Sequence, residues 1–176
     1  MIEWTFPSID KTFVYNLKTK TWSRKVRNDG SSSNLTGHTF VNNKHLVGNK
    51  SNNLIYEMKE SLVTDNGDPV NRSRTTLTFY EKAGNKISVS ELIVYFETGE
   101  VISGESPLAY LEISGDSGKT WTHPSPRPMG QIGEYSKECR WHNLGVQDSY
   151  TFRISVYSSV RVFIMGASID YKVESS

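Results

Sequence analysis

The chain has 176 residues, of which 36% are hydrophobic and 22% charged, and this composition excludes an intrinsically disordered protein. A net charge of +1 gives the whole chain no polyanion-binding signature, and the single cysteine, Cys139, excludes an intramolecular disulfide. No apolar run approaches the roughly 18 residues of a transmembrane helix, and the N-terminus lacks a secretory signal pattern, so we expect no membrane contact.

The charges are distributed unevenly along the chain. Residues 1–50 hold eight Lys or Arg against three acids, whereas the remainder holds twelve against sixteen. The basic bias of the first segment can face nucleic acid or be a solvated surface. We favour the solvated surface, because no aromatic-basic cluster is visible in the sequence.

Residues 1–63 are expected to form one blade of a β-propeller. Aromatic and β-branched residues alternate with turn residues here, which is typical of short strands. Strands are predicted at residues 12–16, 21–23, 38–41, 45–47 and 53–57, with a hairpin turn at Asn42-Asn43. Four or five strands in about 50 residues match one blade. A single blade cannot close a propeller, so we interpret the segment as the end of a longer one.

Residues 64–71 are predicted to be a linker, because they contain a dense cluster of turn-forming residues. Residues 72–176 then carry six or seven longer strands separated by turn signals, which predict a β-sandwich-like antiparallel domain. In the strand at residues 87–96, hydrophobic side chains fall on both faces, so its middle is expected to be buried on both sides. The fold class is therefore all-β, with one propeller-like blade followed by the sandwich, and at most one helical turn at residues 57–63.

The sharpest local motif is an Asp-box, S-x-D-x-G-x-T-W, formed by Ser114, Asp116, Gly118, Thr120 and Trp121. Ser114 and Asp116 can hydrogen-bond backbone groups within the turn, Gly118 supplies a positive φ, and Trp121 packs beneath the hairpin. We interpret the motif as a turn stabiliser. In the sialidase-like propellers where it occurs, it lies away from the catalytic centre.

A proline-rich tract follows the Asp-box and predicts a stiff, extended segment. It can serve as a docking arm for a neighbouring subunit, or as a rigid crossover between two strands. Its candidate interface residues are Pro124, Pro126, Arg127 and Pro128.

An enzyme is the least favoured hypothesis, and we expect no catalytic residues, no metal and no cofactor. A sialidase-type hydrolase needs converging arginines and a Tyr nucleophile with an acidic partner. Clustering of Arg140, Arg153 and Glu134 in a cleft would favour that reading, although the spacing does not predict it. The pair Cys139 and His142 has too few companions for a zinc site, and on a strand Cys139 shares a face with Trp141, which predicts a buried pair.

The order of motifs resembles the C-terminal part of the packaged-DNA stabilisation proteins of short-tailed bacteriophages, also called tail hub or head-completion proteins. The resemblance covers about residues 10–170. Its main motifs are residues 110–121, 130–135, 140–145, 150–155 and 162–167, preceded by residues 12–22, 44–48, 53–56 and 64–69.

The resemblance implies a virion tail protein, assembled in the bacterial host cytoplasm, that forms a hexameric ring below the portal and retains packaged DNA. It implies the portal protein or an adaptor ring, the tail needle and the tailspikes as partners, with possible non-specific contact to packaged DNA, and no catalytic residues. The alternative is a carbohydrate- or receptor-binding β domain, which an exposed platform at Trp4 or Tyr171 would favour.

Overall fold

The computed structural model describes residues 1–27, 29–59, 64–65, 67–82, 84–98, 107–130, 136–159 and 161–175. Within these ranges the regular secondary structure is β-strand apart from one short 3-10 turn, η1 (Pro7–Ile9), with no α-helix, which confirms the all-β prediction. The chain divides into two compact units, residues 1–66 and 67–176.

The first unit contains two separate three-stranded antiparallel sheets where the sequence predicts a single blade. One has the order β1-β2-β3 and the other β4-β5-β6. Asn42 and Asn43 both have positive φ (48° and 61°), as the predicted hairpin turn between β4 and β5 requires. The strands are β1 (Ile2–Phe6), β2 (Lys11–Asn16), β3 (Thr21–Lys25), β4 (Leu35–Val41), β5 (Lys44–Asn49) and β6 (Ile55–Met58), followed by the two-residue β7 (Thr64–Asp65).

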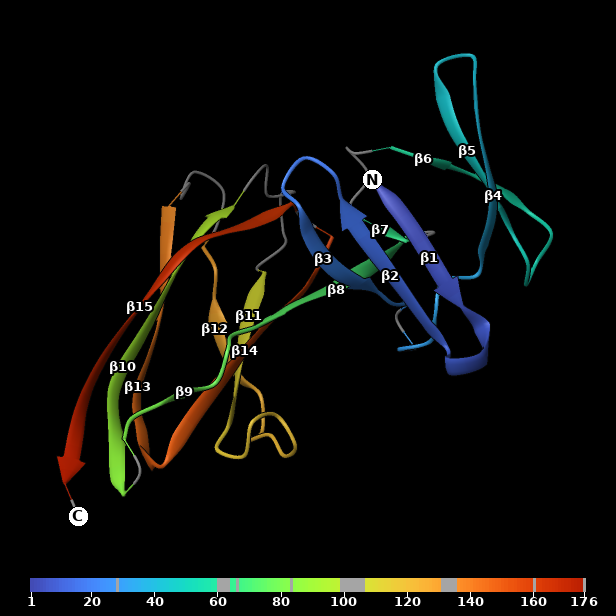
Figure 1. Cartoon of the computed structure of the whole chain (residues 1–176). Coiled ribbons are helices and arrows are strands. Elements are labelled where there is room, and N and C mark those ends of the chain that lie inside the picture. The colour runs from blue at the N-terminus through green and yellow to red at the C-terminus, as the bar shows by residue number, and fades with distance from the viewer. Residues whose placement is uncertain are drawn as a thin grey trace. The chain divides into compact units, whose positions relative to one another are not determined.

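The second unit is a β-sandwich of two antiparallel sheets (Figure 1). One sheet has the order β13-β10-β15, and the other has the order β12-β11-β14-β8 with β9 paired to β14. The strands are β8 (Asp68–Thr75), β9 (Phe79–Tyr80), β10 (Asn85–Thr98), β11 (Leu108–Ser114), β12 (Ser125–Pro128), β13 (Ser136–Gln147), β14 (Ser149–Ser158) and β15 (Val162–Ser175).

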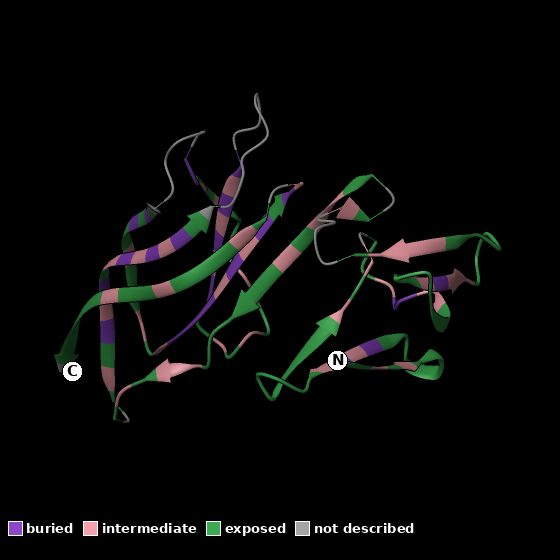
Figure 2. Cartoon of the chain, turned by 90° about the horizontal axis from the view of Figure 1, so that it is seen from above, coloured by how far each residue is buried: buried purple, intermediate pink, exposed green. Residues whose placement is uncertain are grey.

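The core lies between these two sheets, where alternate residues of the central strands are buried (Figure 2). Cys139 and Trp141 are each 1% exposed, so the predicted buried pair on β13 is confirmed. Aliphatic and aromatic side chains from both sheets complete the core: Ile87, Val89, Leu92, Val94, Phe96, Ala109, Leu111, Ile113, Met129, Tyr150, Phe152, Ile154 and Val156.

The prediction that β10 is buried on both sides is wrong, because the strand contains a bulge. Its register against β13 and β15 shifts between Val89 and Glu91. Ser90 is the extra residue relative to β15, and one extra residue moves all later side chains to the opposite face. Val89 and Leu92 therefore point into the same core, although simple alternation places them on opposite faces.

The residues predicted to be a linker contain regular structure. Residues 64–65 form β7, and β8 begins at Asp68. Of the helical turn predicted at residues 57–63, residues 57–58 are the end of β6, and residues 60–63 lie outside the described residues.

Candidate functional site

The Asp-box turn is organised around one carboxylate, that of Asp116. Its Oδ1 accepts hydrogen bonds from the backbone N–H groups of Lys119 (2.9 Å) and Thr120 (2.8 Å), and its Oδ2 accepts the Thr120 hydroxyl (2.6 Å). The Ser114 hydroxyl donates a hydrogen bond to Oδ1 of Asp116 (2.7 Å), and its oxygen accepts one from the backbone N–H of Gly118 (2.8 Å). The hydrogen bonds that Thr120 and Ser114 donate stabilise the ionised carboxylate, and they hold the pKa of Asp116 well below its usual range.

The backbone of this turn adopts a left-handed conformation at two successive residues. Gly118 has φ 89°, which glycine adopts without steric cost, and Ser117 has φ 61°. At Gly115 an added Cβ would meet only the flexible end of the Gln147 side chain, which can move away. Gly118 is therefore the glycine that the backbone conformation of this turn favours.

Trp121 connects the turn to the outer face of the larger sheet. Its indole N–H donates to the carbonyl of Gly118 (3.1 Å), and the guanidinium of Arg153 lies 4.0 Å from the ring centroid. Arg153 also donates from Nε to Glu112 (2.7 Å). The turn is thereby fixed to β11 and β14 by a cation–π contact and an ion pair.

The proline-rich tract is an edge strand, β12, paired antiparallel with β11. The N–H of Met129, just past β12, donates to the carbonyl of Pro107 (2.9 Å). Because successive strand residues alternate in direction, the nitrogens of Pro126 and Pro128 face away from β11. Proline has no N–H, so the outer edge of β12 lacks donors at both positions.

The outward carbonyls of β12 are also occupied. Arg127 donates from its guanidinium to the carbonyl of Pro126 (2.8 Å) and from Nε to that of Arg140 on β13 (2.9 Å). The thiol of Cys139 donates to the carbonyl of Pro128 (3.4 Å). Burial raises the pKa of Cys139 to about 11, so the group stays a thiol donor at neutral pH.

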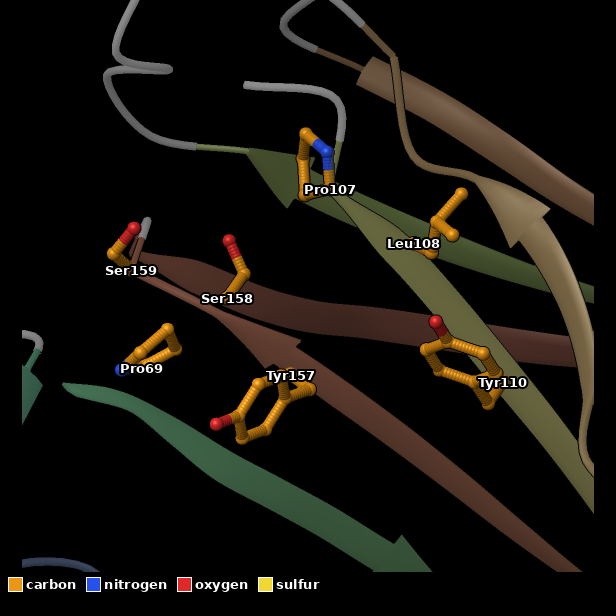
Figure 3. Close-up of a pocket in the computed structure, with 7 residues that line it drawn as sticks. All are labelled: Pro69, Pro107, Leu108, Tyr110, Tyr157, Ser158 and Ser159. Carbon is orange, nitrogen blue, oxygen red and sulfur yellow. The ribbon is translucent and has the colours of Figure 1, made fainter.

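A shallow groove of about 260 Å³ lies at one end of the sheet that contains β8, β11 and β14 (Figure 3). Tyr110 on β11 and Tyr157 on β14 stand on one side of the sheet. Sequence reasoning missed this groove, because the alternation marks both tyrosines as outward-facing but does not show that β11 and β14 are neighbours. Its remaining lining residues are Pro69, Pro107, Leu108, Ser158 and Ser159.

The arginines of the hydrolase hypothesis do not converge among the described residues. Arg140 lies on β13 and donates to Glu91 (3.1 Å) and Glu138 (3.1 Å from Nε). Arg153 belongs to the other sheet and pairs with Glu112. Glu134, the proposed acid, lies outside the described residues.

Two histidines that look scattered in the sequence are in contact in the first unit. Nε2 of His38 and Nδ1 of His45 are 2.9 Å apart, and their rings are stacked at 5.1 Å. The pair lacks further ligands, and in the described part of the chain no group of three or more potential ligands could hold a metal ion. Within the same residues, no helix has the length and apolar character needed to cross a bilayer.

These features describe an all-β domain in which the charged side chains of Asp116, Arg140 and Arg153 each have hydrogen-bond partners within the chain. A family model described as Bacteriophage P22 Gp10, beta-sandwich, matches residues 73–172, and the chain belongs to this family. It is therefore a structural protein of a bacteriophage virion, of the short-tailed phage type that the motif order predicts. No curated protein matches the chain.

Proposed function

We propose that the chain acts in the tail hub of a short-tailed phage, where it helps to close the portal channel, retain packaged DNA and attach tail components. The observation that carries the proposal is the family match over residues 73–172, which spans the sandwich almost completely. The proposed partners are the portal protein or an adaptor ring, the tail needle and the tailspikes, with other copies of the chain completing a hexameric ring.

The sandwich suits a mechanical role, because its surface elements are fixed to its framework. The Asp-box turn is held by Asp116, and Trp121 is held by Arg153. The β12 edge has no outward N–H at Pro126 or Pro128, so neighbouring chains cannot extend the sheet there through a regular ladder. In this proposal, contacts with other tail proteins are made by side chains on the sheet faces, and Asp116 has a structural role.

The groove at Tyr110 and Tyr157 is our candidate contact surface on the sandwich. Tyr157 is 53% exposed, and tyrosine is enriched at protein interfaces because its ring buries apolar area while its hydroxyl stays hydrogen-bonded. The proline-rich strand contributes the exposed Pro126 to the neighbouring surface, opposite Tyr110.

The experiment that tests the proposal is the native mass of the purified chain, alone and mixed with the portal ring of the same phage source. A complex of fixed stoichiometry is expected, and Tyr110→Ser with Tyr157→Ser should weaken it. Tyr80→Ser is the matched control, because Tyr80 is 72% exposed but does not line the groove. If the native mass shows no complex with the portal ring, and none with any other tail protein, the result would contradict the hub function.

A carbohydrate-binding role is the second candidate, and the same groove favours it. The rings of Tyr110 and Tyr157 can stack on a sugar, and their hydroxyls can hydrogen-bond it. Of the two platform residues named from the sequence, Trp4 is 40% exposed and stacks on Trp22, while Tyr171 is 37% exposed and meets Phe79 edge-on. A glycan screen that returns Tyr157-dependent binding would support this role.

A further inference from the structure

One face of the β1-β2-β3 sheet gathers aromatic and basic side chains that are far apart in the sequence. Directly opposed residues of an antiparallel sheet point to the same face. The register therefore places three rows on this face: Ile2, Tyr15 and Trp22; Trp4, Phe13 and Arg24; and Phe6 with Lys11.

The aromatic rings of this face are in contact with each other and open to solvent. Trp22 is 61% exposed and lies between Trp4 (5.2 Å between ring centroids) and Tyr15 (4.9 Å). Phe6 meets Phe13 edge-on at 6.2 Å. Together Trp4, Phe6, Phe13 and Trp22 line a hollow of about 480 Å³.

The opposite face of the same sheet is the one that packs inside the unit. Thr12 and Val14 are buried there, and the Thr12 hydroxyl accepts the N–H of Ser33 (3.0 Å). Lys25 is also on that face, where it is paired with Glu3 (3.0 Å). Among the described residues, the sheet therefore has one face packed within the unit and one aromatic face exposed to solvent.

Charge restricts what can cover the aromatic face. Its strand positions include the cations Lys11 and Arg24 and no carboxylate, whereas Glu3 is on the other face. Asp10, just before β2, is the carboxylate that interacts electrostatically with Arg24, and it accepts a hydrogen bond from the N–H of Ser32. A second copy placed face to face would bring like charges together, so an anionic ligand is favoured. The sequence shows no aromatic-basic cluster in this segment, and the structure corrects that conclusion by bringing the residues together across strands.

We propose that this aromatic face binds single-stranded nucleic acid, with bases stacking on Trp22 and Trp4 and phosphates contacting Lys11 and Arg24. Aromatic rings flanked by cations are the arrangement that recognises unpaired bases without strong sequence preference. A duplex hides the faces of its bases, so it cannot use the rings in this way. The site lies outside residues 73–172 and does not depend on the hub function.

The test is fluorescence anisotropy of a labelled oligothymidylate with the full chain at several salt concentrations. Trp22→Ala should weaken binding by about 5-fold to 150-fold, the range for loss of one stacked base. Lys11→Gln with Arg24→Gln should lower the slope of log Kd against log salt by about 1.4, since each contacted phosphate contributes about 0.7. Trp22→Ala should leave that slope unchanged.

Two controls separate the site from general effects. Lys18→Gln with Lys20→Gln removes the same charge from the turn between β2 and β3, and should leave the affinity within about twofold. Trp22→Phe keeps a ring and should restore most of the affinity that Trp22→Ala loses, which distinguishes lost stacking from a damaged sheet.

Several outcomes would overturn the proposal. These are no binding at low salt, equal affinity for a duplex of the same length, or equal weakening by the Lys18 and Lys20 control. Binding of an acidic peptide with the same dependence on Trp22, without binding of the oligonucleotide, would instead assign the face to an acidic protein segment.

Discussion

Two tryptophans of the sandwich make the same hydrogen bond in different surroundings, and this pair allows a direct test of what holds the two sheets together. The indole N–H of Trp141 donates to the carbonyl of Ser125 (3.0 Å), and that of Trp121 donates to the carbonyl of Gly118 (3.1 Å). Trp141 is 1% exposed and joins β13 of one sheet to β12 of the other, whereas Trp121 is only partly buried on the outer face. Substitution of each by Phe removes the same donor.

The expected costs differ because the Trp141 side chain is almost fully buried, whereas the Trp121 side chain is partly open to solvent. Trp141→Phe leaves the Ser125 carbonyl without its indole partner at the edge of the core, at about 1–3 kcal/mol. The smaller ring loses core contacts worth about 1 kcal/mol more. Trp121→Phe exposes the Gly118 carbonyl to water and keeps an aromatic ring for the Arg153 contact, so its main cost is the net value of one hydrogen bond, about 0.5–1.5 kcal/mol.

Urea unfolding followed by far-UV circular dichroism measures both free energies of unfolding. Trp141→Phe should lower the midpoint clearly more than Trp121→Phe, with the slope m unchanged in both variants. If the two variants lose equal stability, or if Trp121→Phe loses more, burial does not determine how much these hydrogen bonds stabilise the fold. The conclusion that the Trp141 hydrogen bond holds the two sheets together would then be refuted.

Three further predictions concern the edge, the turn and the thiol. Pro126→Thr with Pro128→Thr returns N–H donors to the outer edge of β12, so analytical ultracentrifugation should show increased self-association, whereas Pro124→Thr, outside the strand, should not. Asp116→Ala should abolish hydrogen-exchange protection of the Lys119 and Thr120 amides, and Asp148→Ala should not. In the wild type that protection should also fall as the pH drops below about 3.8, because a lowered pKa stabilises the turn only while the carboxylate is ionised. The raised pKa of Cys139 favours the neutral thiol in the folded state, so its contribution to stability is complete below pH 9.0 and is lost as the pH rises to about 11. Cys139→Ala should therefore lose less stability than the wild type between these two pH values, and an equal loss would contradict this assignment.

The parts of the fold that follow from local pattern were predictable. Period-two alternation placed Cys139 and Trp141 together inside the sandwich, because β13 carries them on an uninterrupted stretch of strand. Alternation failed at β10, where Ser90 is inserted relative to β15. Neither a glycine nor a proline marks that position, and the bulge is defined only by pairing with a strand about 80 residues away.

The candidate surfaces could not be predicted for the same reason. Trp4, Phe13 and Arg24 lie on three strands, and only their register shows that they share a face. Tyr110 and Tyr157 are likewise neighbours only because β14 returns beside β11. The turn at Asp116 is the opposite case, since the hydrogen bonds of its carboxylate come from residues at most four positions away in the sequence.

The chemistry of β12 bears on how such a domain can be assembled. A sandwich edge normally offers a row of N–H and C=O groups to any extended chain. Here the donors are missing at Pro126 and Pro128, and the carbonyls of these residues are bonded by Arg127 and Cys139 from within the same chain. Because the backbone of this edge is already satisfied, specific contacts near β12 depend on side chains such as Tyr110 on the adjoining face. Substitutions on that face should therefore alter assembly more than polar substitutions along the β12 edge that leave both prolines in place.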